Sequence, residues 1–222
     1  MTTKFAVFGS GCIGACVGIS LASTKYDVSF IGRNSEKFET IQRRGTLSLQ
    51  PPESDAPVQE IKCDLLTTDA EVGLRGRQVI FVATKRTANQ TVADSLVDFA
   101  EQGALVVLLQ NGLDTSQLFY EIFNKKKRED LIVFEAVVNF NVVELSPGNF
   151  AWISKRNDSC VAIDGTKFAI VAEEKICSTL RSAGVDSYAD RKFIEVATGK
   201  LLINLINAPS KLGLLSSFST TH

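Results

Sequence analysis

Histidine is almost missing from this chain, since the only one among its 222 residues is His222. Ser-His hydrolytic catalysis and the histidine ligands of a catalytic zinc site are therefore not expected. The five cysteines are an odd number and show no CxxC spacing, which favours neither a disulfide framework nor a structural zinc site. Cys12 and Cys16 lie four residues apart and are interpreted as small packing side chains. We expect no bound metal and a reducing, cytoplasmic compartment.

An excess of positive charge is also lacking, because the formal net charge is −1. Proteins that bind nucleic acid or anionic membranes normally carry a basic excess, so neither partner is expected. No apolar run reaches the roughly 18 residues that a membrane span needs. The apolar start of the chain, Phe5 to Leu21, is interrupted by four glycines, which excludes a signal sequence. We therefore expect a soluble globular protein.

Short apolar segments alternate with helical ones in the first half of the chain. Strands are predicted at residues 4–8, 27–31, 78–83 and 104–109, and helices at 12–21, 35–44, 87–100 and from 111 to about 127. Nearly continuous apolar strands in such an alternation indicate a parallel sheet that is covered on both faces. The fold class predicted is α/β, with a Rossmann-type doubly wound sheet.

The later part of the chain predicts a change of architecture. Residues 45–57 indicate a short hairpin or excursion at the sheet edge, because two prolines end an alternating run. Further strands are predicted at 131–138, 142–145, 150–154 and 167–171, and the SPGN turn at 146–149 joins two of them. From about Glu173 the pattern becomes helical. We predict a nucleotide-binding domain at residues 1–172, followed by a partial, truncated all-helical domain at 173–222.

A glycine-rich loop follows the first predicted strand and opens the first predicted helix. Its glycines have the G-x-G-x-x-G spacing, in which the first permits a tight turn, the second admits a pyrophosphate and the third allows close helix packing. Amide groups at the helix N-terminus would bind the phosphates, aided by the helix dipole. The alternative is an ordinary glycine turn. The predicted cofactor-binding residues are Gly9, Ser10, Gly11, Cys12, Ile13 and Gly14.

The end of the second predicted strand carries Gly32, Arg33 and Asn34 but no acidic residue. An acid at this place would bind the adenosine ribose of NAD. A guanidinium can instead pair with the 2′-phosphate of NADP. Arg33 therefore favours NADP(H), and the alternative is that its side chain is merely exposed.

Several further segments resemble the ketopantoate reductase (2-dehydropantoate 2-reductase) family. These are Phe30-Ile31-Gly32-Arg33, Val82-Ala83-Thr84-Lys85, Leu109-Gln110-Asn111-Gly112-Leu113, Ser146-Pro147-Gly148 and Lys200-Leu201-Leu202-Ile203-Asn204. Members of that family reduce 2-dehydropantoate to (R)-pantoate, in pantothenate biosynthesis, with NADPH. Their active site lies between a Rossmann domain and a helical domain. The resemblance therefore implies an NADP-dependent oxidoreductase that acts on a small 2-oxo acid.

The resemblance also implies roles for particular residues. Lys200 matches the family's catalytic lysine, a cationic acid that would stabilise the oxyanion and donate a proton. Asn111 matches a residue that holds the nicotinamide ribose and orients that lysine, and Lys85 matches a cofactor-binding lysine. Asn204 matches a substrate-binding asparagine. The family has a second substrate-binding asparagine, and Asn207 is the asparagine nearest to its place in this chain. For each lysine or asparagine, an exposed or capping side chain is the alternative interpretation.

Two departures from the family pattern leave other functions open. Ala208 occupies the place of the second substrate asparagine, and the chain is shorter than family members at its C-terminus. In the first hypothesis, an NADPH-dependent reductase, a second copy of the chain in a homodimer or sequence outside this chain would complete the active site. A second hypothesis is a catalytically incomplete NADP-binding module that has lost most of the helical domain. A third, a hydroxyacyl-type dehydrogenase, needs a catalytic histidine that only His222 could supply.

Overall fold

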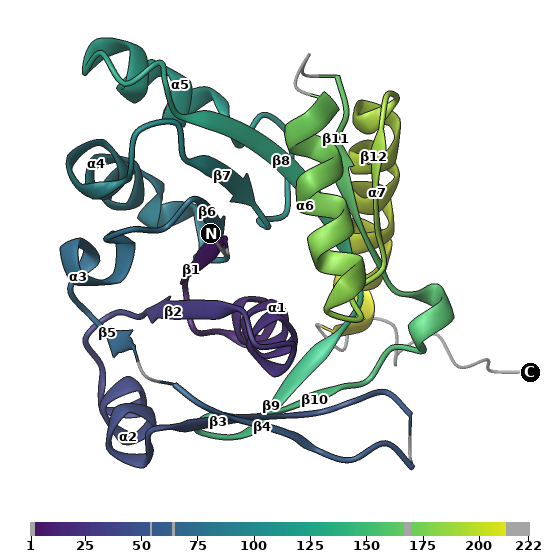
Figure 1. The fold of residues 1–222 in the computed structure, drawn as a ribbon. Coiled ribbons are helices and arrows are strands. Elements are labelled where there is room, and N and C mark those ends of the chain that lie inside the picture. The colour runs from purple at the N-terminus through teal and green to yellow at the C-terminus, as the bar shows by residue number, and fades with distance from the viewer. Residues whose placement is uncertain (1–2, 54, 64, 167–169, 212–222) are drawn as a thin grey trace, which may run out of the picture.

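The computed structural model describes residues 3–53, 55–63, 65–166 and 170–211, with the backbone alone for residues 206–211. Its larger sheet has eight strands in the order β12-β11-β8-β7-β6-β1-β2-β5 (Figure 1). Their bounds are β1 Lys4–Phe8, β2 Asp27–Ile31, β5 Leu66–Thr67, β6 Val79–Val82, β7 Leu105–Leu108, β8 Ile132–Asn139, β11 Cys160–Asp164 and β12 Ser187–Asp190. All pairs from β5 to β8 are parallel, and β11 runs antiparallel to β8. The predicted doubly wound α/β fold is confirmed.

Helices cover both faces of this sheet. One face carries α1 (Cys12–Ser23) and α6 (Ile170–Ser182), which share an apolar core with alternate residues of β1, β6 and β7. The opposite face carries α3 (Ala70–Leu74), α4 (Asn89–Phe99) and α5 (Gln117–Lys125). Helix α7 (Phe193–Lys211) packs against β8 and β11 through a cluster that contains Val137, Ala162, Phe193 and Ala197.

A second sheet of four strands lies on the far side of α1, in the order β4-β3-β10-β9 (Figure 1). Its strands are β3 Thr46–Gln50, β4 Gln59–Lys62, β9 Val142–Ser146 and β10 Asn149–Trp152. The hairpin predicted around residues 146–149 is present as β9 and β10. The hairpin that begins in the predicted segment 45–57 is longer than expected, because its second strand is β4, and it belongs to this separate sheet rather than to the edge of the main one. The structure joins the two hairpins, because β3 pairs in parallel with β10. Helix α1 lies between the two sheets, which explains why it is apolar on all sides.

Local signals in the sequence fix the ends of several helices. In α2 (Glu36–Arg44), the Ser35 side chain accepts a hydrogen bond from the Phe38 amide, and Gly45 ends the helix in the left-handed region with φ 69°. Asp69 caps α3 by accepting from the amides of Glu71 and Val72. By contrast, α1 begins after Gly11 without a side-chain cap.

The prediction for residues 160–190 was partly wrong. Ile170 and Val171, expected in a strand, open α6, whereas β11 and β12 were missed. Short apolar runs fit a buried strand and a buried helix equally well, so periodicity could not separate them. Strand β12 extends the main sheet beyond residue 173, where the sequence pattern predicted helices alone. The division into domains at residue 172 stays a prediction.

Within the described residues, no helix combines the length and the apolar character that crossing a membrane requires. The same part of the chain contains no group of three or more His, Cys, Asp or Glu side chains able to hold a metal ion.

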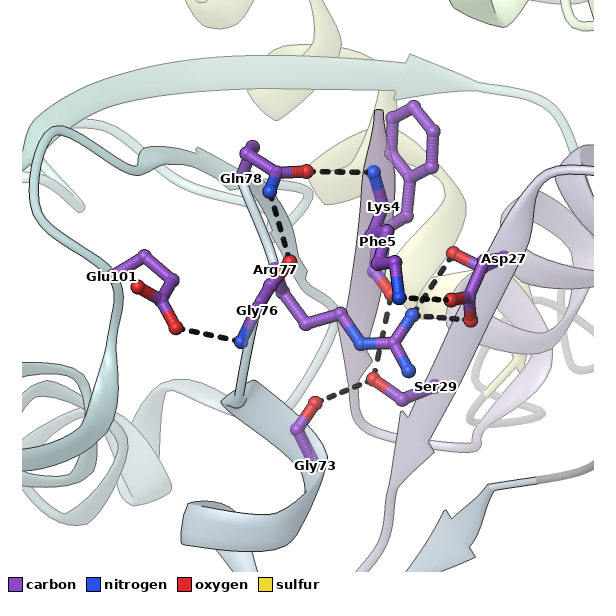
Figure 2. A network of polar contacts seen from close by, with 9 residues as sticks. All are labelled: Lys4, Phe5, Asp27, Ser29, Gly73, Gly76, Arg77, Gln78 and Glu101. Carbon is purple, nitrogen blue, oxygen red and sulfur yellow. Dashed lines mark hydrogen bonds and ion pairs between the residues drawn. The ribbon is translucent and has the colours of Figure 1, made fainter. Parts of the chain in front are cut away.

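A polar network joins the N-terminal ends of β1, β2 and β6 (Figure 2). The buried guanidinium of Arg77 donates to the backbone carbonyl and the carboxylate of Asp27, and Lys4 forms an ion pair with the same carboxylate at 3.2 Å. Burial alone would raise the pKa of Asp27, but the hydrogen bonds from Arg77 and Lys4 hold it below its usual value. The network lies at the N-terminal ends of these strands, and the glycine loop lies at their C-terminal ends.

Asp27→Asn should lower the free energy of unfolding at neutral pH by about 1–2 kcal/mol. This is less than for a fully buried pair, because the Asp27 side chain is 46% exposed. A carboxylate whose folded-state pKa is lowered stabilises the fold above its unfolded pKa of about 3.9, and the contribution is lost as pH falls through the folded value. Denaturant unfolding at pH 7 and at pH 3 measures the effect. A difference between the two proteins that is equally large at both pH values would contradict this role.

Candidate functional site

Four loops that the sequence singled out meet at one edge of the main sheet. Gly9 follows β1, Arg33 follows β2, Lys85 follows β6 and Asn111 follows β7. These strands are parallel neighbours, so their carboxyl ends lie together. The edge is also the switch point of the sheet, because β1 is flanked by β2 on one side and by β6 on the other. In open α/β sheets this is where ligands bind.

Packing explains two of the three loop glycines. Gly9 has φ +102°, and a Cβ there would lie 2.9 Å from the Ala83 carbonyl carbon and oxygen. A Cβ on Gly14 would lie 1.9 Å from the Gly9 carbonyl oxygen and 3.0 Å from Val7. The fold itself therefore excludes any side chain at both positions.

Gly11 differs from its two neighbours in the motif. Its φ is −76°, which any residue can adopt, and a Cβ there would meet no atom within 4 Å. Neither backbone conformation nor packing therefore requires glycine at this position. The open space in front of Gly11 is where the motif places a pyrophosphate.

The first turn of α1 provides the donors for such an anion. Gly11 is the N-cap residue, no side chain caps the helix, and the first turn has no acidic residue. The first amides of a helix lack partners within the helix, and the dipole adds partial positive charge there. Ser10, Cys12 and Ile13 are part-buried at this turn. The residues present thus fit a bound phosphate group.

Arg33 lies beyond β2 with an exposed side chain. It makes no hydrogen bond or ion pair with any other described residue. A Cβ on the preceding Gly32 would overlap the ring of Phe38, at 2.3 Å, so the chain passes close to α2 here. The backbone therefore places Arg33 near the start of α2, and its exposed guanidinium is available to an anion.

A hydrogen-bond cluster ties the loop after β6 to the loop after β7. The buried Gln110 side chain donates from Nε2 to the Thr84 carbonyl oxygen at 2.9 Å and to Asn89 Oδ1 at 2.7 Å. Lys85 and Asn111, which follow Thr84 and Gln110, are both exposed. The cluster therefore fixes the backbone from which these two side chains project. Gln110 belongs to the Leu109–Leu113 motif, but no role for it was predicted from the sequence.

A buried carboxylate fixes the far end of the Asn111 loop. Glu135 on β8 accepts hydrogen bonds from the backbone amide of Ser116 at 2.8 Å and from its hydroxyl at 2.6 Å. Sequence reasoning missed Glu135. A single charged residue within an apolar strand was the available signal, because a buried carboxylate needs partners.

Lys200 lies on α7 and lines a cavity of about 230 Å³. Its side chain is half-buried, and Nζ donates to Asn139 Oδ1 at 3.3 Å. Leu113, from the loop that carries Asn111, packs against the cluster that holds α7 to the sheet. The loop and the helix thus adjoin, but the hydrogen bond of Lys200 goes to Asn139 rather than to Asn111.

Asn204, one of the two predicted substrate asparagines, is not among the described residues that line this cavity. Asn204 is exposed, and the cavity is lined instead by Gly199 and Ile203 from the neighbouring helical turn. The side chain of Asn207 lies outside the described residues. Both assignments stay predictions.

Comparison with known proteins gives a family for this arrangement. The family model described as ketopantoate reductase PanE/ApbA matches residues 5–159, which include the glycine loop, Arg33, Lys85 and Asn111. The chain belongs to the ketopantoate reductase PanE/ApbA family.

Two solved structures are similar to this chain in fold. The 2-dehydropantoate 2-reductase from Methylococcus capsulatus superposes with a TM-score of 0.71 at 19% identity, over 96% of this chain and 64% of that one. A D-mandelate dehydrogenase bound to NADH and anilino(oxo)acetate gives a TM-score of 0.67 at 16% identity, over 85% and 57% of the two chains.

Among curated proteins, the chain is similar to a glycerol-3-phosphate dehydrogenase [NAD(P)+] from Thermoanaerobacter sp. (strain X514). The two are 23% identical over 209 residues, which is 91% of this chain and 57% of the relative. This ketopantoate reductase family member therefore spans less than two thirds of the length of each relative named here.

Proposed function

We propose that this chain binds NADPH at its glycine loop and reduces the ketone of a small 2-oxo acid, specifically 2-dehydropantoate to (R)-pantoate. The main support is the open space in front of Gly11, the one glycine of the loop that the fold does not require to lack a side chain. An uncapped helix start and an exposed Arg33 beside it support the same ligand. Family membership supports the reaction class.

The position of Lys200 supports a reductase. NADPH supplies the hydride that reaches the carbonyl carbon, and negative charge then develops on the ketone oxygen. A lysine ammonium at the edge of a cavity can bind that oxygen and donate the proton that makes it a hydroxyl. The glycine loop follows β1, and β8 lines the Lys200 cavity. These two strands are three strand spacings apart in the sheet, which is roughly 14 Å. An extended dinucleotide suits such a span.

A non-catalytic NADP-binding module is the second candidate, because the chain spans only 57% of the curated relative. The placement of Lys200 distinguishes the two candidates. A lysine that faced bare solvent would favour the binding module, whereas this one lines a cavity and is held by a hydrogen bond. A homodimer, a cytoplasmic location and a part in pantothenate biosynthesis stay predictions.

Gly11→Val should abolish NADPH binding and leave the melting temperature unchanged, because the new side chain fills the pyrophosphate space without touching the core. Gly14→Ala is the matched control: its Cβ would overlap the Gly9 carbonyl oxygen, so it should lower the melting temperature. Cofactor fluorescence and thermal unfolding measure the two effects. Normal NADPH binding by folded Gly11→Val would reject the glycine-loop site.

Arg33→Ala should weaken NADPH binding by about tenfold or more and leave NADH binding nearly unchanged. A charge-assisted hydrogen bond to the 2′-phosphate contributes about 1.5–3 kcal/mol, and NADH has no such group. Fluorescence titration with both cofactors checks this. If wild-type and Arg33→Ala proteins bind both cofactors with equal affinity, Arg33 does not select NADPH.

Lys200→Ala should lower kcat for 2-oxo acid reduction by roughly a hundredfold or more, with NADPH affinity preserved. The alkoxide forms only as hydride arrives, so a group that stabilises it acts on kcat. NADPH oxidation with 2-dehydropantoate and related 2-oxo acids is the assay. A wild-type chain that binds NADPH but reduces none of them would favour the binding module, and near-normal kcat in Lys200→Ala would exclude the lysine as donor.

A further inference from the structure

We propose that Asn139 is the positioning residue for the Lys200 ammonium, a role that sequence reasoning gave to Asn111. The proposal rests on the proposed ketone reduction. It starts from the only hydrogen bond that Lys200 makes within the described chain, from Nζ to Asn139 Oδ1 at 3.3 Å. Both residues line the 230 Å³ cavity.

The amide of Asn139 is held in the orientation that this contact needs. Its Nδ2 donates to the Asp158 carbonyl oxygen at 3.3 Å, which leaves Oδ1 as the atom that faces Lys200. Asp158 belongs to the short helix η2 (Arg156–Asp158), which leads into β11. Asn139 is also the last residue of β8 and pairs with Cys160 of β11. The acceptor is thus built on a strand end, where its position is better defined than on a loop.

A neutral acceptor suits a lysine that has to give up a proton. A carboxylate in the same place would hold the ammonium more tightly and favour its charged form. An amide oxygen fixes the position of the four-carbon side chain without neutralising its charge. Asn139 therefore directs the ammonium into the cavity and leaves its proton available.

The other titratable groups that line the cavity form no hydrogen bond with Lys200 within the described chain. They are Cys160 on β11, Tyr188 on β12 and Glu195 on α7 itself. The pKa of the Cys160 thiol and that of the Tyr188 phenol are both raised, mainly by burial. Both groups are therefore uncharged at neutral pH. The Glu195 side chain is 73% exposed and lies 3.8 Å from Lys192.

The test is the pH dependence of Lys200 labelling by acetic anhydride, read by mass spectrometry of the peptide that contains Lys200. Asn139→Asp should raise the labelling midpoint by about one pH unit or more, because the new carboxylate contacts the ammonium directly. Asn141→Asp is the matched control, since it adds the same charge two residues further along at an exposed position. It should leave the midpoint unchanged. Equal shifts in both variants, or none in Asn139→Asp, would overturn the proposal.

A kinetic measurement separates positioning from general damage to the fold. Asn139→Ala should lower kcat on the order of tenfold to a hundredfold, because a displaced donor loses its alignment with the ketone oxygen. Its melting temperature and NADPH affinity should stay close to those of the wild type. Unchanged kcat in an active Asn139→Ala protein would also overturn the proposal.

If the wild type reduces no 2-oxo acid, the proposed function fails, and the labelling experiment still decides whether Asn139 holds Lys200.

Discussion

The contact between α1 and β1 is the constraint on which the rest of the structure depends. Gly14 lies against the Gly9 carbonyl oxygen and Val7, and Gly18 lies against the ring of Phe30, where a Cβ would come within 2.3 Å of the ring. These glycines have no side chain between the helix and the strands, so α1 packs directly on the main sheet. The second sheet can then cover the opposite side of the helix. Its burial then links the main sheet, the second sheet and α6 through one apolar core.

The two edges of the main sheet are built in opposite ways. At the N-terminal edge, cations and carboxylates form ion pairs with one another, as in the network of Arg77, Asp27 and Lys4. At the C-terminal edge, buried groups such as Gln110 and Glu135 hold the backbone of the loops, while Arg33 and Lys85 stay exposed. The ion pairs of the N-terminal edge and the exposed cations of the C-terminal edge are therefore separated by the length of the strands.

The family match covers the C-terminal edge of the main sheet. The matched residues, 5–159, contain the glycine loop and its neighbouring loops. Lys200 lies outside the matched range, on a helix whose place is set by packing on β8 and β11. The proposed cofactor binding thus depends on the backbone geometry of the loops, and the proposed catalysis depends on the packing that positions α7.

The parallel sheet, the glycine turn and the ends of α2 could be predicted from local patterns alone, which are apolar strands, residues that must lack a side chain, and capping residues. How distant segments pair became known only from the folded structure. It joined the hairpins at β3 and β10 into one sheet, assigned residues 160–164 and 187–190 to strands, and gave Lys200 the partner Asn139, 61 residues away. No local pattern encodes such pairings, because each arises only when segments separated in sequence bury their surfaces against one another.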